Sequence, residues 1–203
     1  MQTSRGGHNI LSTHTLGRVG AFIDESNLFH SQKTLKWRVD YEKLYWMLRD
    51  LDLGTRNIFL YTSFLKTSQK QLEFIDKLVD YGYFVHSKPV KEIKSGSNVL
   101  SRKGNLDIEL ALDAFQFSHL YDTLILFSGD SDFDYLLELL KQNGKKTIVV
   151  SARKNISFEL MRRSHVYLDL KKLRYYIEDR AHKSLKATLA DGFGGTTVTI
   201  ISK

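Results

Sequence analysis

The chain has 203 residues, of which 42% are hydrophobic, and this is enough for one sizeable core but short for two. Lysine and arginine outnumber aspartate and glutamate by 30 to 23, so the net charge of +7 attracts polyanions and makes nucleic acid the first partner to consider. The absence of cysteine excludes a disulfide framework and a thiolate metal site. No apolar stretch approaches the ~18 residues of a membrane span, and the N-terminus lacks a signal-peptide pattern, which predicts a cytoplasmic protein.

Composition divides the chain into three parts. Residues 1–16 are rich in glycine, serine and threonine and predict a flexible arm. Residues 17–180 predict one domain, and residues 181–203 form a tail that either adds an edge strand or stays unpaired. The domain opens on an apolar strand at residues 19–23, which ends at Asp24 and is followed by Asn27. These two polar residues are either part of a site or helix caps.

Strands and helices then alternate along the chain. We expect helices over residues 37–50 and 68–81, each followed by an apolar strand, at residues 57–61 and 83–85. Further strands are expected at residues 146–150 and 166–168, with helices over residues 157–163 and 170–177. Alternation at this spacing predicts right-handed crossovers and a parallel sheet.

A basic segment at residues 86–104 interrupts this alternation. Pro89 and Gly96 mark it as a loop or loose hairpin. It is either a solvated loop or a flap that grips phosphates beside a site. It carries one acid and five cations, which are Lys88, Lys91, Lys94, Arg102 and Lys103.

The next helix is expected over residues 106–119, with Asp107 in its first turn. Asp113 comes six residues later, which is ~240° around the helix at ~100° per residue. The two carboxylates therefore lie on different faces, and Asp113 is the weaker candidate for a site.

The most informative stretch is residues 122–133. An apolar run at residues 124–127 stops at Ser128 and Gly129, and two acids follow, Asp130 and Asp132. Such a run suits a strand covered on both faces of a parallel sheet, and ligands of such sheets bind beyond the carboxyl ends of the strands. The alternative is a helix N-cap, but a cap needs one acid and not two.

Three motifs follow one another along the chain. They are Phe22-Ile23-Asp24-x-x-Asn27, then Lys103-Gly104-x-x-Asp107 followed by Leu112-Asp113, and Ser128-Gly129-Asp130-Ser131-Asp132-Phe133. Together they resemble the NYN domains of the LabA-like group, within the PIN-like nuclease superfamily, and the resemblance covers residues 18–170.

This resemblance implies a three-layer α/β fold with a central, mostly parallel sheet in the order 3-2-1-4-5, and a divalent-metal ribonuclease site. In that order the strands ending at Asp24 and Asp130 are neighbours, ~4.8 Å apart. Asp107 and Asp132 would complete an oxygen-only cluster, which suits Mg²⁺ or Mn²⁺ and not zinc.

The remaining residues of the predicted site would bind substrate. We expect Asn27 and Ser128 to orient water or a phosphate oxygen, and Lys103 to grip the RNA backbone together with the other cations of residues 86–104. The expected partner is RNA, with single-stranded RNA as one option. The sequence leaves the oligomeric state open, with a homo-oligomer as one alternative.

Two other functions compete with a ribonuclease. A nucleic-acid or protein interaction module would keep the fold without turnover. A metal-dependent phosphatase of small molecules would use the acids but would leave the basic segment without a role.

Overall fold

The computed structural model describes residues 16–51, 57–95 and 98–180, with the backbone alone for residues 92–103. Its centre is a six-stranded sheet in the order β3-β2-β1-β6-β7-β8, in which every neighbouring pair is parallel. The predicted α/β class and the order of the first five strands are confirmed, and a sixth strand is added beyond them. The predicted arm and tail lie outside the described residues, except for Leu16, which is buried in the core.

The six strands of this sheet have between four and seven residues, a usual length in globular proteins. β1 and β6, at its centre, are buried at every position, which confirms that both of their faces are covered. The strands are β1 Val19–Asp24, β2 Ile58–Phe64, β3 Phe84–Pro89, β6 Thr123–Phe127, β7 Lys146–Ser151 and β8 Val166–Asp169.

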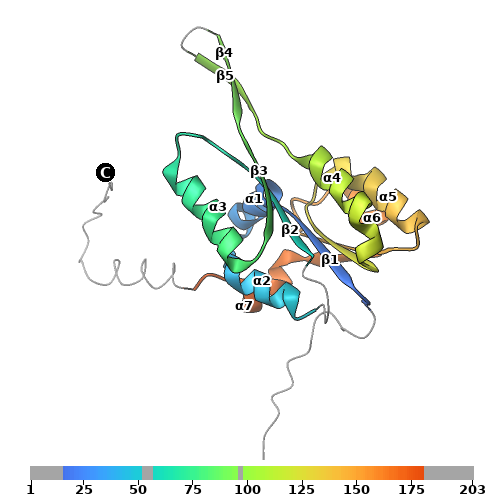
Figure 1. Cartoon of the computed structure of the whole chain (residues 1–203). Coiled ribbons are helices and arrows are strands. Elements are labelled where there is room, and N and C mark those ends of the chain that lie inside the picture. The colour runs from blue at the N-terminus through green and yellow to red at the C-terminus, as the bar shows by residue number, and fades with distance from the viewer. Residues whose placement is uncertain (1–15, 52–56, 96–97, 181–203) are drawn as a thin grey trace, which may run out of the picture.

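Helices cover both faces of the sheet (Figure 1). One face carries α1 Glu25–Leu35, α2 Tyr41–Arg49, α3 Gln69–Tyr81 and α7 Arg174–Ile177. The other carries α4 Asp107–Gln116, α5 Asp134–Gln142 and α6 Phe158–Arg163. Short 3₁₀ turns lie at η2 Phe117–Leu120, η3 Ser131–Phe133 and η4 Leu170–Leu173. None of the described helices is both long and apolar enough to cross a membrane.

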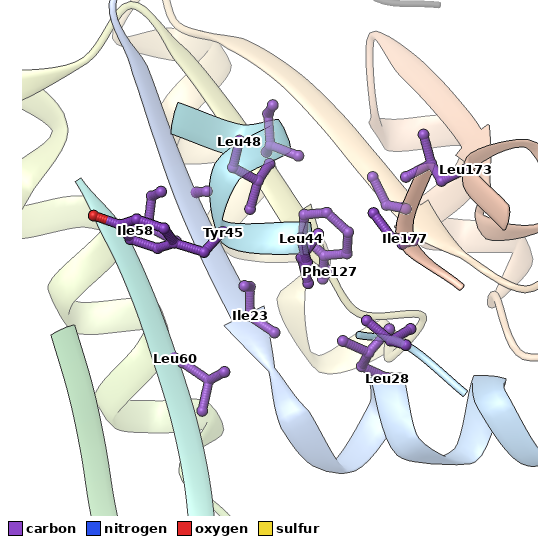
Figure 2. Close-up of a cluster of buried hydrophobic side chains, with 14 of the residues drawn as sticks. Ile23, Leu28, Leu44, Tyr45, Leu48, Ile58, Leu60, Phe127, Leu173 and Ile177 are labelled. Atoms are coloured by element: carbon purple, nitrogen blue, oxygen red, sulfur yellow. The ribbon is translucent and has the colours of Figure 1, made fainter. Parts of the chain in front are cut away.

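Two hydrophobic clusters, one on each face, fix how the strands are placed. One cluster joins Leu44 of α2 to the strand residues Ile23, Leu60 and Phe127 (Figure 2). Phe22, the neighbour of Ile23, belongs to the opposite cluster. Because side chains alternate along a strand, a slip of one residue would exchange the two sets of contacts. Packing therefore fixes the register of the strands, and with it the position of the residues that follow their carboxyl ends.

The basic segment forms a hairpin, the second of the two structures that the sequence allowed. β4 Lys91–Ser95 and β5 Asn98–Lys103 pair antiparallel and project away from the central sheet (Figure 1). The preceding strand was expected to end at residue 85, but β3 continues to Pro89. Proline is tolerated there because β3 is an edge strand, so one side of it needs no hydrogen-bond donor.

Candidate metal centre

Asp24 lies at the carboxyl end of β1, next to the loop that follows β6. The register pairs Ile23 with Phe127, so the residues after these two leave the sheet side by side. Asp24 is 7% exposed, and both of its carboxylate oxygens accept hydrogen bonds. The Asn27 backbone N–H donates to Oδ1 at 3.1 Å, and Ser128 Oγ donates to Oδ2 at 3.0 Å. Asp24 therefore caps α1 and also belongs to the acidic site.

The loop after β6 is held in place from two sides. The Gly129 N–H donates to Asn27 Oδ1 at 3.1 Å, and the Gly129 carbonyl accepts from the Ser157 N–H at 2.9 Å. A Cβ on Gly129 would lie 2.2 Å from the Asn155 carbonyl oxygen, so only glycine fits this close approach. The loop continues into η3, which Asp130 caps by accepting from the Asp132 N–H at 3.1 Å.

Asp107 is the first residue of α4 and is oriented by Asn105. The Asp107 N–H donates to Asn105 Oδ1 at 2.6 Å, and Asn105 Nδ2 donates to the Asp107 carboxylate. One oxygen from each of Asp107, Asp130 and Asp132 lies within 4.8 Å of the other two. Three carboxylates at this spacing, with no nitrogen or sulfur ligand among them, suit a hard divalent cation. Asp24 lies outside this group of three.

The four acids nevertheless share one electrostatic environment. The pKa of Asp107 is raised from its ordinary 3.8 to about 6, mainly by burial, then by the charge of Asp24, with Asp130 and Asp132 adding to the effect. Burial also raises the pKa of Asp24, against the hydrogen bonds from Asn27 and Ser128. Among the described side chains, none of the ion pairs involves these four acids. A bound cation would relieve their mutual repulsion.

The residues predicted to bind substrate fall into different places. The Asn27 amide and the Ser128 hydroxyl lie inside the site, where they hold Gly129 and Asp24. The Lys88 ammonium pairs with Glu109 at 2.6 Å, and Lys91 is exposed. The side chains of three others lie outside the described part of the chain; they are Lys94, Arg102 and Lys103.

Asp113 lies apart from the acidic group, as its helical position predicted. Its Oδ2 accepts from the Tyr61 hydroxyl at 2.9 Å and lies 3.4 Å from His86 Nδ1. Its carboxylate is therefore engaged by β2 and β3.

Sequence reasoning missed two residues that support the site. Asn105 could have been found, because an asparagine two residues before a helix start favours a local turn. Glu25 gave no such signal. It accepts from the Tyr41 hydroxyl at 3.2 Å and from Thr62 Oγ1 at 3.3 Å, and burial raises its pKa. These contacts anchor the first turn of α1 beside Asp24.

Comparison with known proteins agrees with this architecture. The chain is 37% identical over 164 residues to the low amplitude and bright protein LabA of Synechococcus elongatus, covering 79% of this chain and 88% of that protein. A crystal structure of a protein of unknown function from Vibrio parahaemolyticus has a similar fold, with a TM-score of 0.60 and 22% identity, covering 79% of this chain and 96% of that one. The NYN domain model matches residues 18–171. The chain therefore belongs to the NYN domain family.

Proposed function

We propose that this protein is a divalent-metal-dependent endoribonuclease that hydrolyses RNA phosphodiester bonds. The observation that carries the proposal is the group of three carboxylates, Asp107, Asp130 and Asp132, whose oxygens lie within 4.8 Å of one another. They lie beyond the carboxyl ends of central parallel strands, where such sheets bind ligands. Membership of the NYN family supports a nuclease over other uses of an acidic cluster.

Asp107, Asp130 and Asp132 would hold Mg²⁺ or Mn²⁺. The ion, when bound, supplies Lewis-acid activation of water and neutralises charge on the leaving oxygen of the phosphodiester. Asp24 adds negative charge next to the group from a position fixed by Ser128. Asn27 holds the backbone of the loop that carries Asp130, so the spacing of the carboxylates does not depend on the ion alone.

Substrate attraction would come from the basic hairpin and the overall charge. The net charge of +7 draws in polyanions, and exposed cations such as Lys91 can contact phosphates. The hairpin leads directly into α4, which begins at Asp107. An RNA strand held at the base of the hairpin would therefore pass near the carboxylates.

The test is an incubation of the purified full chain with labelled single-stranded RNA in Mg²⁺, in Mn²⁺ and in chelator. We expect cleavage only with a divalent ion, loss of cleavage in Asp130→Asn, and retention in Asp113→Asn, a matched control on another helix face. Cleavage that survives excess chelator or Asp130→Asn would overturn the proposal. RNA binding without cleavage in any metal would favour an interaction module, and turnover of a simple phosphate ester would favour a phosphatase.

A further inference from the structure

An exposed aromatic residue lies at the start of the helix that is held to the acidic loop. Phe158, the first residue of α6, is 61% exposed. The residue before it, Ser157, donates its N–H to the carbonyl of Gly129 at 2.9 Å, and α6 contacts the η3 turn that contains Asp132. The start of α6 is thus fixed to the loop that carries Asp130 and Asp132. Figure 1 shows α6 on the same side of the sheet as α4 and α5.

One cation lies against this ring, and two more lie nearby in the chain. The Arg162 guanidinium lies 5.4 Å from the centroid of the Phe158 ring. Arg153 Nη1 lies 2.9 Å from the sulfur of Met161, which shares a helix face with Phe158 because the two are three residues apart. Lys154, next to Arg153, is exposed. We call Arg153, Lys154, Phe158 and Arg162 the α6 platform.

The α6 platform lies opposite the hairpin across the sheet. The hairpin continues β3 at one edge, whereas the platform follows β7, and the carboxylate loop after β6 lies between them. Residues 153–163 carry four cations and one acid, and one of these cations, Arg163, is paired with Asp134 and Glu138 of α5, so this flank is basic as well. A strand crossing the carboxyl ends of the sheet would therefore meet cations on both sides of the acids.

An exposed ring near cations fits one class of ligand well. Sites for single-stranded nucleic acid combine a cationic track for the backbone with aromatic rings on which bases stack. A single ring beside charged residues offers little of the contiguous apolar area that the centre of a protein interface needs. Arginine near the ring also favours a planar base, because guanidinium groups stack on π systems.

We propose that the α6 platform is a nucleotide subsite, in which Phe158 stacks on a base of single-stranded RNA while Arg153 and Lys154 contact its phosphates. This rests on the proposed function, since it places that base within a few nucleotides of the phosphodiester held at the carboxylates. The strand then runs from the hairpin, past Asp107 and Asp130, to α6.

The test measures binding of fluorescein-labelled single-stranded RNA to the full chain carrying Asp130→Asn, in chelator, so that cleavage does not interfere. Phe158→Ala should weaken binding by roughly five- to 150-fold, the range for losing one base–aromatic stack. Phe158→Trp should bind like the parent. Phe158→Leu should be as weak as Phe158→Ala, since it keeps apolar bulk without a ring face. Recovery of binding by leucine would overturn stacking.

Tyr175→Ala is the matched control. Tyr175 is 76% exposed and has the Arg180 guanidinium 5.3 Å from its ring centroid, but it belongs to α7 on the other face of the sheet. We expect Tyr175→Ala to bind like the parent. Equal losses from Tyr175→Ala and Phe158→Ala, or no loss from Phe158→Ala, would overturn the subsite.

A scan of the RNA with one abasic nucleotide then locates the base. At one position, an abasic nucleotide should lower the affinity of the parent for the RNA. The affinity of Phe158→Ala should not change when the abasic nucleotide is at that position. Sensitivity that is the same in both proteins at every position would overturn the proposal. The two proposals can fail separately. If the parent never cleaves RNA but Phe158→Ala still weakens binding, the nuclease alone is refuted. If Phe158→Ala cleaves and binds RNA as well as the parent does, the subsite alone is refuted.

Discussion

The hydroxyl of Ser128 donates to the carboxylate of Asp24 at 3.0 Å and so connects the ends of β1 and β6. The two residues are 104 positions apart in the chain, and both are buried. Together with the Asn27 N–H on the other oxygen, this hydrogen bond fixes the direction of the carboxylate. It also lowers the pKa of Asp24, although burial prevails and the pKa stays raised.

Removing this contact should weaken the site without dismantling the fold. Ser128→Ala leaves one Asp24 oxygen without a donor, which costs about 1–3 kcal/mol of unfolding free energy. The Ser128 hydroxyl also accepts from the Asp130 N–H at 3.3 Å, and loss of a residue that supports a metal ligand typically lowers metal affinity or activity by ~10–100-fold. Calorimetric metal titration measures the metal affinity, and RNA cleavage rates measure the activity. Ser131→Ala, exposed in the same loop, is the control, and an equal loss there would refute a specific role for Ser128.

Substitution within the acidic cluster should separate activity from stability. Asp24→Asn, Asp107→Asn and Asp130→Asn should each abolish divalent-dependent cleavage, and pairing two of them should add little, because the residues act as one unit.

Without metal, Asp130→Asn should melt no lower than the parent, since it removes repulsion and keeps an oxygen for the η3 cap. A large drop in the melting temperature in chelator would instead make Asp130 a structural residue.

Asp132→Asn should be milder than these three substitutions. Asp132 is exposed, so water can take the place of a lost carboxylate contact. Asp113→Asn should retain most activity because its partners are Tyr61 and His86 rather than the acidic group. RNA cleavage rates of all variants at saturating Mg²⁺ rank their activities. An Asp113→Asn protein that folds but does not cleave RNA would contradict this ranking.

The stability of the metal-free protein should depend on the charge of Asp107. Its pKa in the folded protein is raised to about 6 from 3.8, so its contribution to stability is fully present below about pH 4 and is lost as pH rises through 6. Asp107→Asn cannot ionise and escapes this loss. The melting temperature of Asp107→Asn minus that of the parent should therefore increase between pH 4 and pH 7 in chelator. A difference that stays constant with pH would show that Asp107 does not titrate in this range.

The cations of the basic segment at residues 86–104 should differ in their contributions to RNA binding. Lys88 is paired with Glu109 at 2.6 Å, whereas Lys91 is exposed. Lys91→Ala should lower the slope of log affinity against log salt by about 0.7, the value for one phosphate contact on a single strand, and Lys88→Ala should lower it by less. Glu109→Gln should strengthen binding by releasing Lys88. If the salt slope of each of the three variants equals that of the parent, the basic segment is only a solvated surface.

Gly129 should tolerate no side chain. A Cβ there would meet the Asn155 carbonyl oxygen at 2.2 Å, and overpacking of this kind costs about 1–3 kcal/mol. Gly129→Ala should therefore lower the melting temperature and reduce cleavage, because the loop carrying Asp130 must move. Gly144→Asn is the comparison: a side chain there meets nothing within 4 Å, and asparagine accepts the positive φ of 71°. If Gly129→Ala melts like the parent, the loop adapts and the close approach is not a constraint.

Much of the fold could be predicted from local patterns. Apolar runs marked every strand of the central sheet, and the resemblance to NYN domains gave the order of five of them. The predicted ends of helices were less accurate, because a single capping side chain can decide where a helix begins. The helix expected from residue 37 begins at Tyr41, because Asp40 caps it by accepting from the Lys43 N–H at 3.1 Å. The helix expected to reach residue 119 becomes a 3₁₀ turn after Gln116.

By itself, the sequence determined the placement of Asp24 and Asp130 at strand ends and of Asp107 at a helix start, because hydrophobic periodicity and chain order are local properties. Only the tertiary structure decided which groups meet. It pairs Lys88 with Glu109, joins Glu25 to Thr62, and brings Ser157, the residue before Phe158, to Gly129 of the acidic loop. Each of these contacts spans 21 or more residues of chain, and its distance depends on how the whole sheet and its helices pack. No periodicity within one element encodes that distance.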